Sequence, residues 1–254
     1  LLGDNYELFA DYYNVNRKGY WEHDNYILLR DEDEETLAKK HNLSLEALQA
    51  KMAASEAILM KERDTRIRPG LDDKTLTSWN GLMLKGYVDA YLTFGDQHFL
   101  DVALENANFI LSKQLRKDGG LNHSYKEGRS TINGYLEDYA FVIDAFLKLY
   151  EATFDDLWLK EADALMVYSV EHFYDYDSGM FFFTSDEDPA LIARKMEVND
   201  NVIPASNSAM ANNLFVLSHH YDRIDYNQKS IQMLNNVIDK LTSYPAGYSN
   251  WLNL

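Results

Sequence analysis

The sequence predicts an all-α protein, a partial (α/α)6 toroid that carries β-hairpin loops at one end. Three observations support this fold class. Helices that are apolar on nearly every side alternate along the chain with helices that carry one apolar stripe. A weak internal repeat relates successive helix pairs, and the loops between helices alternate between short and long. Together these features indicate inner helices surrounded by outer ones, and we expect residues 1–254 to be part of a single toroid domain.

Six helices from residue 77 onward follow this alternation. The helices that are apolar almost all round, and must therefore be covered on all sides, are 77–93, 136–152 and 207–221. The helices with one apolar and one charged face, which we expect to meet water, are 97–114, 156–173 and 226–242. A further striped helix begins near Ser44. The first set should form the inner layer and be the more buried.

The internal repeat is visible at small residues. When Tyr91 is aligned with Tyr150 and with Tyr221, one small residue of each inner helix falls at the same place. These small residues are Gly81, Ala140 and Ala211. A small side chain at this point lets neighbouring inner helices approach closely, so the repeat has a packing explanation that needs no function.

The loops are unequal in a regular way. Short turns follow each inner helix, at 94–96, 154–156 and 222–225. Long connections precede each inner helix, at 63–76, 115–135 and 174–206. Since the two kinds alternate, all long connections should meet at one end of the array, over the N-termini of the inner helices.

Two long connections are predicted to contain β-hairpins. In one, strand 121–125 turns at 126–128. In the other, strand 180–184 returns through 191–194. The N-termini of the inner helices, beneath these loops, would form a funnel. Free N–H groups and the positive ends of the helix dipoles lie there, and we expect a ligand to bind in it.

Composition restricts the partners. Lys and Arg number 24 against 41 Asp and Glu, a net charge of −17, which argues against nucleic acid or an anionic membrane as partner. There is no Cys, no apolar run long enough to span a bilayer and no visible signal peptide. We expect a cytoplasmic protein without cofactor or metal. The start at Leu1 suggests a piece of a longer protein.

Polar and aromatic residues gather around the predicted inner-helix starts. Amides, acids and aromatic rings suit a polyhydroxylated ligand, because rings cover sugar C–H faces and polar groups bond hydroxyls. The same residues also suit helix caps and first turns, and both interpretations stay open. The candidates for substrate binding are Arg66, Asp72, Lys74, Trp79, Asn80, His123, Tyr135, Tyr139, Ser206 and Asn207.

Carboxylates are the candidates for catalysis. Glu137 and Asp138 are adjacent and point different ways from a helix, so glycoside hydrolysis would need one of them to pair with Asp73 or Asp72 across the funnel. The catalytic candidates are therefore Glu137, Asp138 and Asp73. Among the histidines, only His123 lies on a loop at the funnel, where it would suit general acid or base chemistry.

Several ordered blocks resemble the YyaL / spermatogenesis-associated protein 20 family. The blocks are Arg-Asp-Thr-Arg at 63–66, Leu-Asp-Asp-Lys at 71–74, Ser-Trp-Asn-Gly-Leu at 78–82, Gly-Tyr-Leu-Glu-Asp-Tyr-Ala at 134–140 and Asn-Val-Ile-Pro-Ala-Ser-Asn-Ser at 201–208. The resemblance implies a thioredoxin-like domain upstream of Leu1. It also implies a toroid related to six-hairpin glycosidases and N-acylglucosamine 2-epimerases. Two departures are a Pro-Ala-Ser turn at 204–206 in place of Pro-Ser-Gly, and no counterpart to the histidine pair of the epimerases.

Two hypotheses of function follow. The leading one is a domain that binds or converts a sugar or sugar derivative, as an epimerase, an isomerase or a glycosidase-like enzyme. The other is a non-catalytic helical scaffold that binds a polypeptide or serves the attached thioredoxin-like domain. Catalysis predicts acids with shifted pKa values in the funnel, whereas a scaffold predicts an open, shallow mouth.

Overall fold

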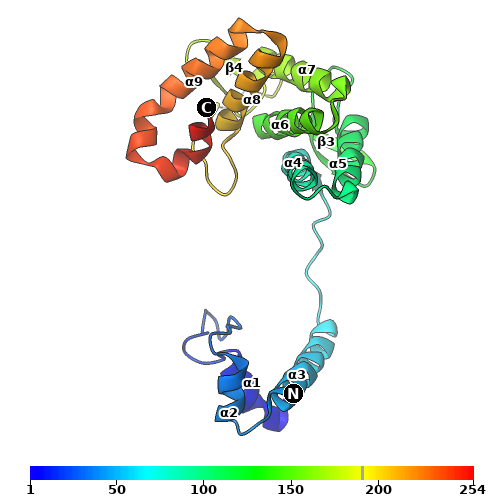
Figure 1. Cartoon of the computed structure of the whole chain (residues 1–254), viewed down its shortest axis with the longest axis vertical. Coiled ribbons are helices and arrows are strands. Elements are labelled where there is room, and N and C mark those ends of the chain that lie inside the picture. Colours follow the sequence, from blue (N-terminus) through cyan, green and yellow to red (C-terminus); the bar gives the residue numbers. More distant parts are fainter. Residues whose placement is uncertain (190–191) are drawn as a thin grey trace. The chain divides into compact units, whose positions relative to one another are not determined.

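The computed structural model describes residues 1–189 and 192–254, and the chain divides into two compact units, Leu1–Asp72 and Asp73–Leu254 (Figure 1). Each unit is described by itself. That all 254 residues belong to one toroid stays a prediction. None of the helices in the described ranges combines the length and the apolar character that crossing a bilayer requires.

The first unit is a small helical cluster. Its elements are η1 (Gly3–Asn5), α1 (Tyr6–Tyr12), α2 (Glu34–Lys40) and α3 (Leu45–Asp64). Helix α3 begins where Ser44 accepts a hydrogen bond from the amide of Ala47, and α2 begins in the same way at Asp33. The buried residues that hold the cluster together are Leu8, Phe9, Tyr12, Leu37, Ala38, Leu48 and Met52.

The second unit contains the predicted helix pairs. The inner helices are α4 (Thr77–Phe94), α6 (Leu136–Thr153) and α8 (Ser206–Tyr221). The outer helices are α5 (Gln97–Phe109), continued by a π-turn η2 (Ile110–Gln114), α7 (Asp156–Phe173) and α9 (Ile224–Ser243), followed by η3 (Pro245–Asn253). Figure 1 shows α4, α6 and α8 as an inner row backed by α5, α7 and α9. This confirms the alternation of inner and outer helices.

Burial follows the prediction for two inner helices and departs from it for the third. Helices α6 and α8 are the most buried helices of the unit. Helix α4 buries five of its 18 residues, fewer than the seven of 18 in the outer helix α7. One face of α4 is open, with Trp79 61% and Met83 58% exposed. The reason is position, since α4 is the first inner helix of the row and has an inner neighbour on one side only.

The small residues of the repeat lie at close helix crossings, as predicted. A Cβ atom on Gly81 would lie 2.8 Å from the backbone carbonyl carbon of Phe141, so α4 and α6 touch there backbone to backbone. At Ala140, the backbone oxygen accepts a hydrogen bond of 2.7 Å from the Asn213 side chain of α8. Gly81 therefore has a structural role.

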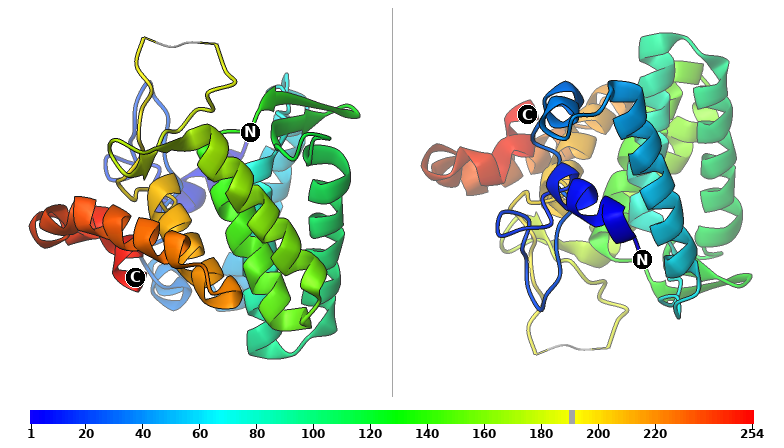
Figure 2. Two further views of the ribbon diagram at one scale, coloured as in Figure 1. Left: turned by 90° about the horizontal axis from the view of Figure 1, so that it is seen from above. Right: turned by 90° about the horizontal axis from the view of Figure 1, so that it is seen from below.

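From Asp73 onward, the long connections meet at the N-terminal ends of the inner helices, as predicted. Strands β1 (Thr75–Leu76), β2 (Asn122–Lys126) and β3 (Arg129–Asn133) form one antiparallel sheet in that order, which confirms the first hairpin. The amide of Leu136 donates to the carbonyl of Phe183 at 2.9 Å, which joins the second connection to the third. The left view of Figure 2 shows these loops at one end and the short turns at the other.

The second predicted hairpin pairs differently. Strand β5 (Met180–Phe181) pairs with β4 (Tyr174–Asp175), directly after α7, and the predicted return of 180–184 through 191–194 is wrong in this respect. Gly179, with φ of 70°, closes a tight turn between the two strands, and this local closure costs less entropy than a long loop. One backbone hydrogen bond of 2.7 Å joins the Phe183 amide to the carbonyl of Lys195, the residue that follows the predicted partner segment 191–194. Leu191 lies outside the described residues.

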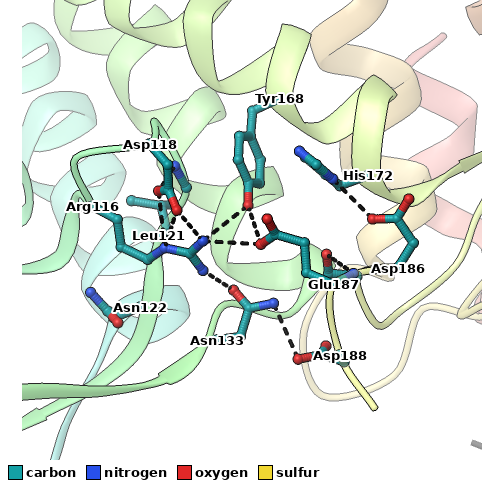
Figure 3. Close-up of polar contacts among 12 residues, drawn as sticks. Arg116, Asp118, Leu121, Asn122, Asn133, Tyr168, His172, Asp186, Glu187 and Asp188 are labelled. Atoms are coloured by element: carbon teal, nitrogen blue, oxygen red, sulfur yellow. Dashed lines mark hydrogen bonds and ion pairs between the residues drawn. The ribbon is translucent and has the colours of Figure 1, made fainter. Parts of the chain in front are cut away.

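A polar network, here named the Arg116 clamp, fixes these loops to the helices (Figure 3). It consists of Arg116, Asp118, Asn133, Tyr168 and Glu187. The Arg116 guanidinium contacts Glu187 at 3.0 Å, and the Tyr168 hydroxyl donates to the same carboxylate at 2.8 Å. Because the clamp joins the second and third connections to α7, it holds the end of the unit in one arrangement.

Candidate functional site

The candidate site is built around Asp138, in the first turn of α6. Its side chain is fully buried, and its two oxygens accept three hydrogen bonds. One oxygen accepts from the Ser78 amide of α4 at 2.8 Å. The other accepts from the Tyr135 amide at 2.9 Å, as part of a capping box, and from His123 Nδ1 of β2 at 2.9 Å. Asp138 therefore joins two inner helices to the hairpin.

His123 is held in a defined orientation by this contact. Its Nδ1 faces Asp138, and its ring packs against Tyr135 with centroids 4.8 Å apart. Because Nδ1 is occupied by the carboxylate, Nε2 is the ring nitrogen left for other partners. The hydrogen bond to Asp138 raises the pKa of His123 above its usual 6.5, against the opposing effect of burial.

We expect the His123 pKa to lie above 6.5 when its ring protons are followed by NMR across a pH titration. Because the pKa of His123 is raised in the folded state, the bond between its imidazolium and Asp138 stabilises the fold. This stabilisation is fully present below the pKa that His123 has in the unfolded chain. It is lost as the pH rises through the folded pKa. The loss should be absent in His123→Gln. A measured pKa at or below 6.5 would show that Asp138 does not hold the imidazolium.

Glu137 lies beside this pair and is half-buried. The Ser78 hydroxyl donates to it at 3.3 Å. Burial raises the pKa of Glu137, and the carboxylates of Asp138 and Glu197 raise it further. A raised pKa shifts a carboxyl group toward its protonated form, which is the direction that a general acid requires.

Glu197, in the connection before α8, was not among the sequence candidates. Its carboxylate accepts a hydrogen bond of 3.1 Å from the Ser206 amide, at the start of α8. The only signal in the sequence is weak: α8 has no acid of its own in its first turn, so its positive dipole end lacks a local partner. Glu197 is thus a carboxylate near Glu137 that the sequence did not indicate, and the predicted pairing of Glu137 or Asp138 with Asp73 or Asp72 stays a prediction.

A metal ion has one possible place among the described residues. His123, Glu137 and Asp138 offer ligand atoms that lie within 4.8 Å of one another. Both oxygens of Asp138 already accept hydrogen bonds, which a metal would have to displace. The donor set suits a hydrogen-bonded acid–base group better than a metal centre, and the expectation of no metal stays a prediction.

Three of the candidate binding residues have side chains or amides engaged in holding the fold. The Tyr139 hydroxyl accepts from the Leu121 amide at 2.8 Å, and its ring stacks on Tyr168. The Asn207 side chain accepts a hydrogen bond from the Phe181 amide and donates one to the Phe181 carbonyl, each at 2.9 Å. The two bonds attach α8 to β5. Ser206 donates its amide to Glu197, and its buried hydroxyl has no partner among the described residues. Structural roles account for Tyr139 and Asn207.

The remaining candidates are divided between the site and its surroundings. Lys74 lies close enough to His123 to lower its pKa slightly, so it belongs to the site. Asp73 pairs with Lys126 at 2.6 Å near the hairpin turn, where Lys126 lowers the Asp73 pKa. Asn80 donates to the Leu76 carbonyl at 2.8 Å, and Trp79 is on the open face of α4.

Arg66 and Asp72 belong to the first unit, which is described separately from the site. Their roles in binding stay predictions.

Comparison with known proteins supports the interpretation of the fold. No protein-family model matches the sequence. The uncharacterized protein B0495.5 of Caenorhabditis elegans is 30% identical over 270 residues, which cover 96% of this chain and 36% of that protein. Human spermatogenesis-associated protein 20 is 29% identical over 222 residues, which cover 84% of this chain and 28% of that protein. The chain thus spans about a third of the length of these relatives, and an upstream thioredoxin-like domain stays a prediction.

Solved structures of low sequence identity share the fold. A GH76 α-mannanase of Bacteroides thetaiotaomicron has a TM-score of 0.56 at 17% identity, covering 69% of this chain and 46% of that one. A cellobiose 2-epimerase of Bacillus thermoamylovorans has a TM-score of 0.54 at 13% identity, covering 67% and 46%. A family 105 glycoside hydrolase of C. acetobutylicum has a TM-score of 0.54 at 12% identity, covering 81% and 61%. The chain is therefore a distant homologue of spermatogenesis-associated protein 20 and B0495.5 over most of its length, with the partial (α/α)6 toroid fold of six-hairpin glycosidases and sugar epimerases.

Proposed function

We propose that the site at the start of α6 binds a sugar or sugar derivative and carries out acid–base chemistry on it, as an epimerase, isomerase or glycosidase-like enzyme. Glu137 and His123 are the catalytic residues in this proposal. Asp138, fully buried and bonded on both oxygens, acts as a positioning residue through His123. The sequence predicts a catalytic role for Asp138, and this proposal gives it a positioning role instead.

The observation that carries the proposal is the arrangement of two different proton-transfer groups around one fixed carboxylate. Asp138 bonds His123 Nδ1, which leaves Nε2 to exchange a proton with a ligand. Glu137 is the adjacent residue, and burial and the neighbouring carboxylates raise its pKa, which favours its protonated form relative to an exposed glutamate. One group can accept a proton while the other donates, which epimerisation, isomerisation and glycoside hydrolysis all require.

The surroundings suit a sugar. Tyr135 stacks on Phe183 with centroids 5.1 Å apart, beside the His123 ring, and aromatic faces of this kind cover the C–H surface of a sugar ring. Lys74 adds a donor near His123. The fold neighbours named above include an α-mannanase and a cellobiose 2-epimerase, and this likeness of fold adds weight without assigning a reaction.

The test is Glu137→Gln, assayed with a panel of mono- and disaccharides. In heavy water, NMR would report both deuterium uptake at a sugar carbon and glycosidic cleavage. We expect turnover to fall by about 10²–10⁴-fold, as is usual when a general acid is removed. The variant should stay folded and lose no stability at neutral pH, because a raised pKa means that ionising Glu137 in the fold is unfavourable.

The matched control is Glu171→Gln, which removes an exposed carboxylate from α7 and should leave turnover unchanged. Unaltered turnover in Glu137→Gln would remove this residue from the mechanism. If the unmodified chain bound and converted none of the sugars, the non-catalytic scaffold would become the better hypothesis.

A further inference from the structure

A cavity lies against the inner row, and none of the residues that form the site at the start of α6 lines it. Its volume is about 410 Å³, within the range of small-molecule sites, and it is bounded by α4, α6, α8 and η3. Leu82, Phe141 and Val216 form part of an apolar wall. Glu137 is not among the lining residues, and Asp144 lies in the lining about two helical turns further along α6.

Asp144 is the unusual group in this cavity. It has no hydrogen-bond or ion-pair partner among the residues that the structure describes, and its side chain is half-buried. Two lysines also line the cavity, and both pair with other carboxylates. Lys85 pairs with Asp89 at 3.0 Å, and Lys148 pairs with Glu151 at 2.8 Å. A half-buried carboxylate that bonds no described residue is available to pair with a ligand cation in the cavity.

Two side-chain amides that line the cavity use their nitrogen in hydrogen bonds within the protein. Asn213 donates its Nδ2 to the Ala140 carbonyl at 2.7 Å, and Asn212 donates its Nδ2 to the Ser208 carbonyl at 2.9 Å. No donor is bonded to the side-chain oxygen of Asn213 or Asn212 within the described ranges. The atoms that these two amides leave for a ligand are therefore acceptors, and a ligand that matches them must donate hydrogen bonds.

We propose that this cavity is a second binding site, for a small hydroxylated molecule that carries a primary ammonium group. The ammonium would lie against Asp144, the hydroxyls against the free amide oxygens and the carbon skeleton against Phe141 and its apolar neighbours. This site is distinct from the proposed sugar site, and either can exist without the other.

The first test compares D-glucosamine with D-glucose, two probes that differ in an ammonium and a hydroxyl group. Calorimetric titration of the chain at pH 7.5 should show binding of glucosamine and none, or much weaker binding, of glucose. Asp144→Asn should weaken glucosamine binding by at least about tenfold, the effect of losing a charge-assisted hydrogen bond. Because Asp144 bonds none of the described residues, the variant should melt no earlier than the unmodified chain.

Asp101→Asn makes the same change of charge on the exposed side of α5 and should leave glucosamine binding as it was. Glu137→Gln should leave it unchanged too. The proposal is overturned if glucose binds as well as glucosamine, if neither binds, or if Asp144→Asn binds normally. It is also overturned if Glu137→Gln alone abolishes binding, since the amine would then occupy the site at the start of α6.

The pH dependence supplies an independent measurement. Burial raises the pKa of Asp144 to about 6; Asp89 and Glu151 add to this, and Lys85 and Lys148 oppose it. The parts of α8 and η3 that line the cavity contribute amides and no charged group. Glucosamine binding should therefore weaken as the pH falls through about 6, because the protonated carboxyl no longer attracts the ammonium. Binding that is the same at pH 5 and pH 7.5 would contradict the role of Asp144.

Discussion

Replacing Asp138 with Asn should lower the free energy of unfolding by about 3–5 kcal/mol, the usual cost of removing one member of a buried charged pair. Three N–H groups, from Ser78, Tyr135 and His123, point at its two oxygens. An amide in its place would set its own NH₂ against at least one of these donors. Burial raises the pKa of Asp138 while its donors lower it. Because each partner is a donor, we expect the ionised form to be the one that the fold requires.

Urea unfolding at neutral pH measures this effect. The matched control is Asp155→Asn, the same substitution at the exposed N-cap of α7, where Asp155 accepts from the Leu157 amide at 3.0 Å. Asn caps a helix almost as well as Asp, so the control should change stability by less than about 0.5 kcal/mol. Equal small effects in both variants would mean that Asp138 does not join α4, α6 and β2 in the way described.

Gly81→Ala should destabilise the fold by about 1–3 kcal/mol, the range found when a methyl group is forced into a close-packed site. The added Cβ would lie 2.8 Å from the carbonyl carbon and 2.9 Å from the carbonyl oxygen of Phe141. Both atoms belong to the backbone of α6, which cannot turn away as a flexible side chain would. The substitution would therefore push two inner helices apart.

Gly86→Ala provides the comparison on the same helix. A Cβ atom at Gly86 meets nothing within 4 Å, so only the ordinary preference of helices for Ala should act. We expect a gain of about 0.5–1 kcal/mol there. Thermal or urea unfolding of the two variants should thus give shifts of opposite sign. Two shifts in the same direction would contradict the close crossing at Gly81.

The sequence predicts most of the fold because periodicity and loop length report on burial. The inner position of α6 and α8 follows from apolar residues on every side, and the close crossing follows from the small residues of the repeat. The open face of α4 could not be predicted in this way. Its residues are as apolar as those of α6, and only the absence of a second inner neighbour in the unit exposes Trp79 and Met83.

The candidate site is predictable where it depends on local sequence. Glu137 and Asp138 belong to the first turn of a helix, and His123 to the adjoining hairpin, so their positions follow from the order of elements. Glu197 lies in an irregular stretch, and its approach to Glu137 depends on how the chain crosses from β5 to α8. Asn207 resembles a ligand-binding residue in sequence, but its side chain bonds the backbone of Phe181 and the carbonyl of Glu197.

The Arg116 clamp also has a consequence for the order in which the molecule folds. It joins Arg116 to Glu187, two residues with the whole of α6 and α7 between them in the sequence. Closing the clamp costs the entropy of that long intervening segment, so we expect the clamp to close after the helices between its two ends have formed. On this expectation the loops at this end are among the last parts of the unit to assemble during folding.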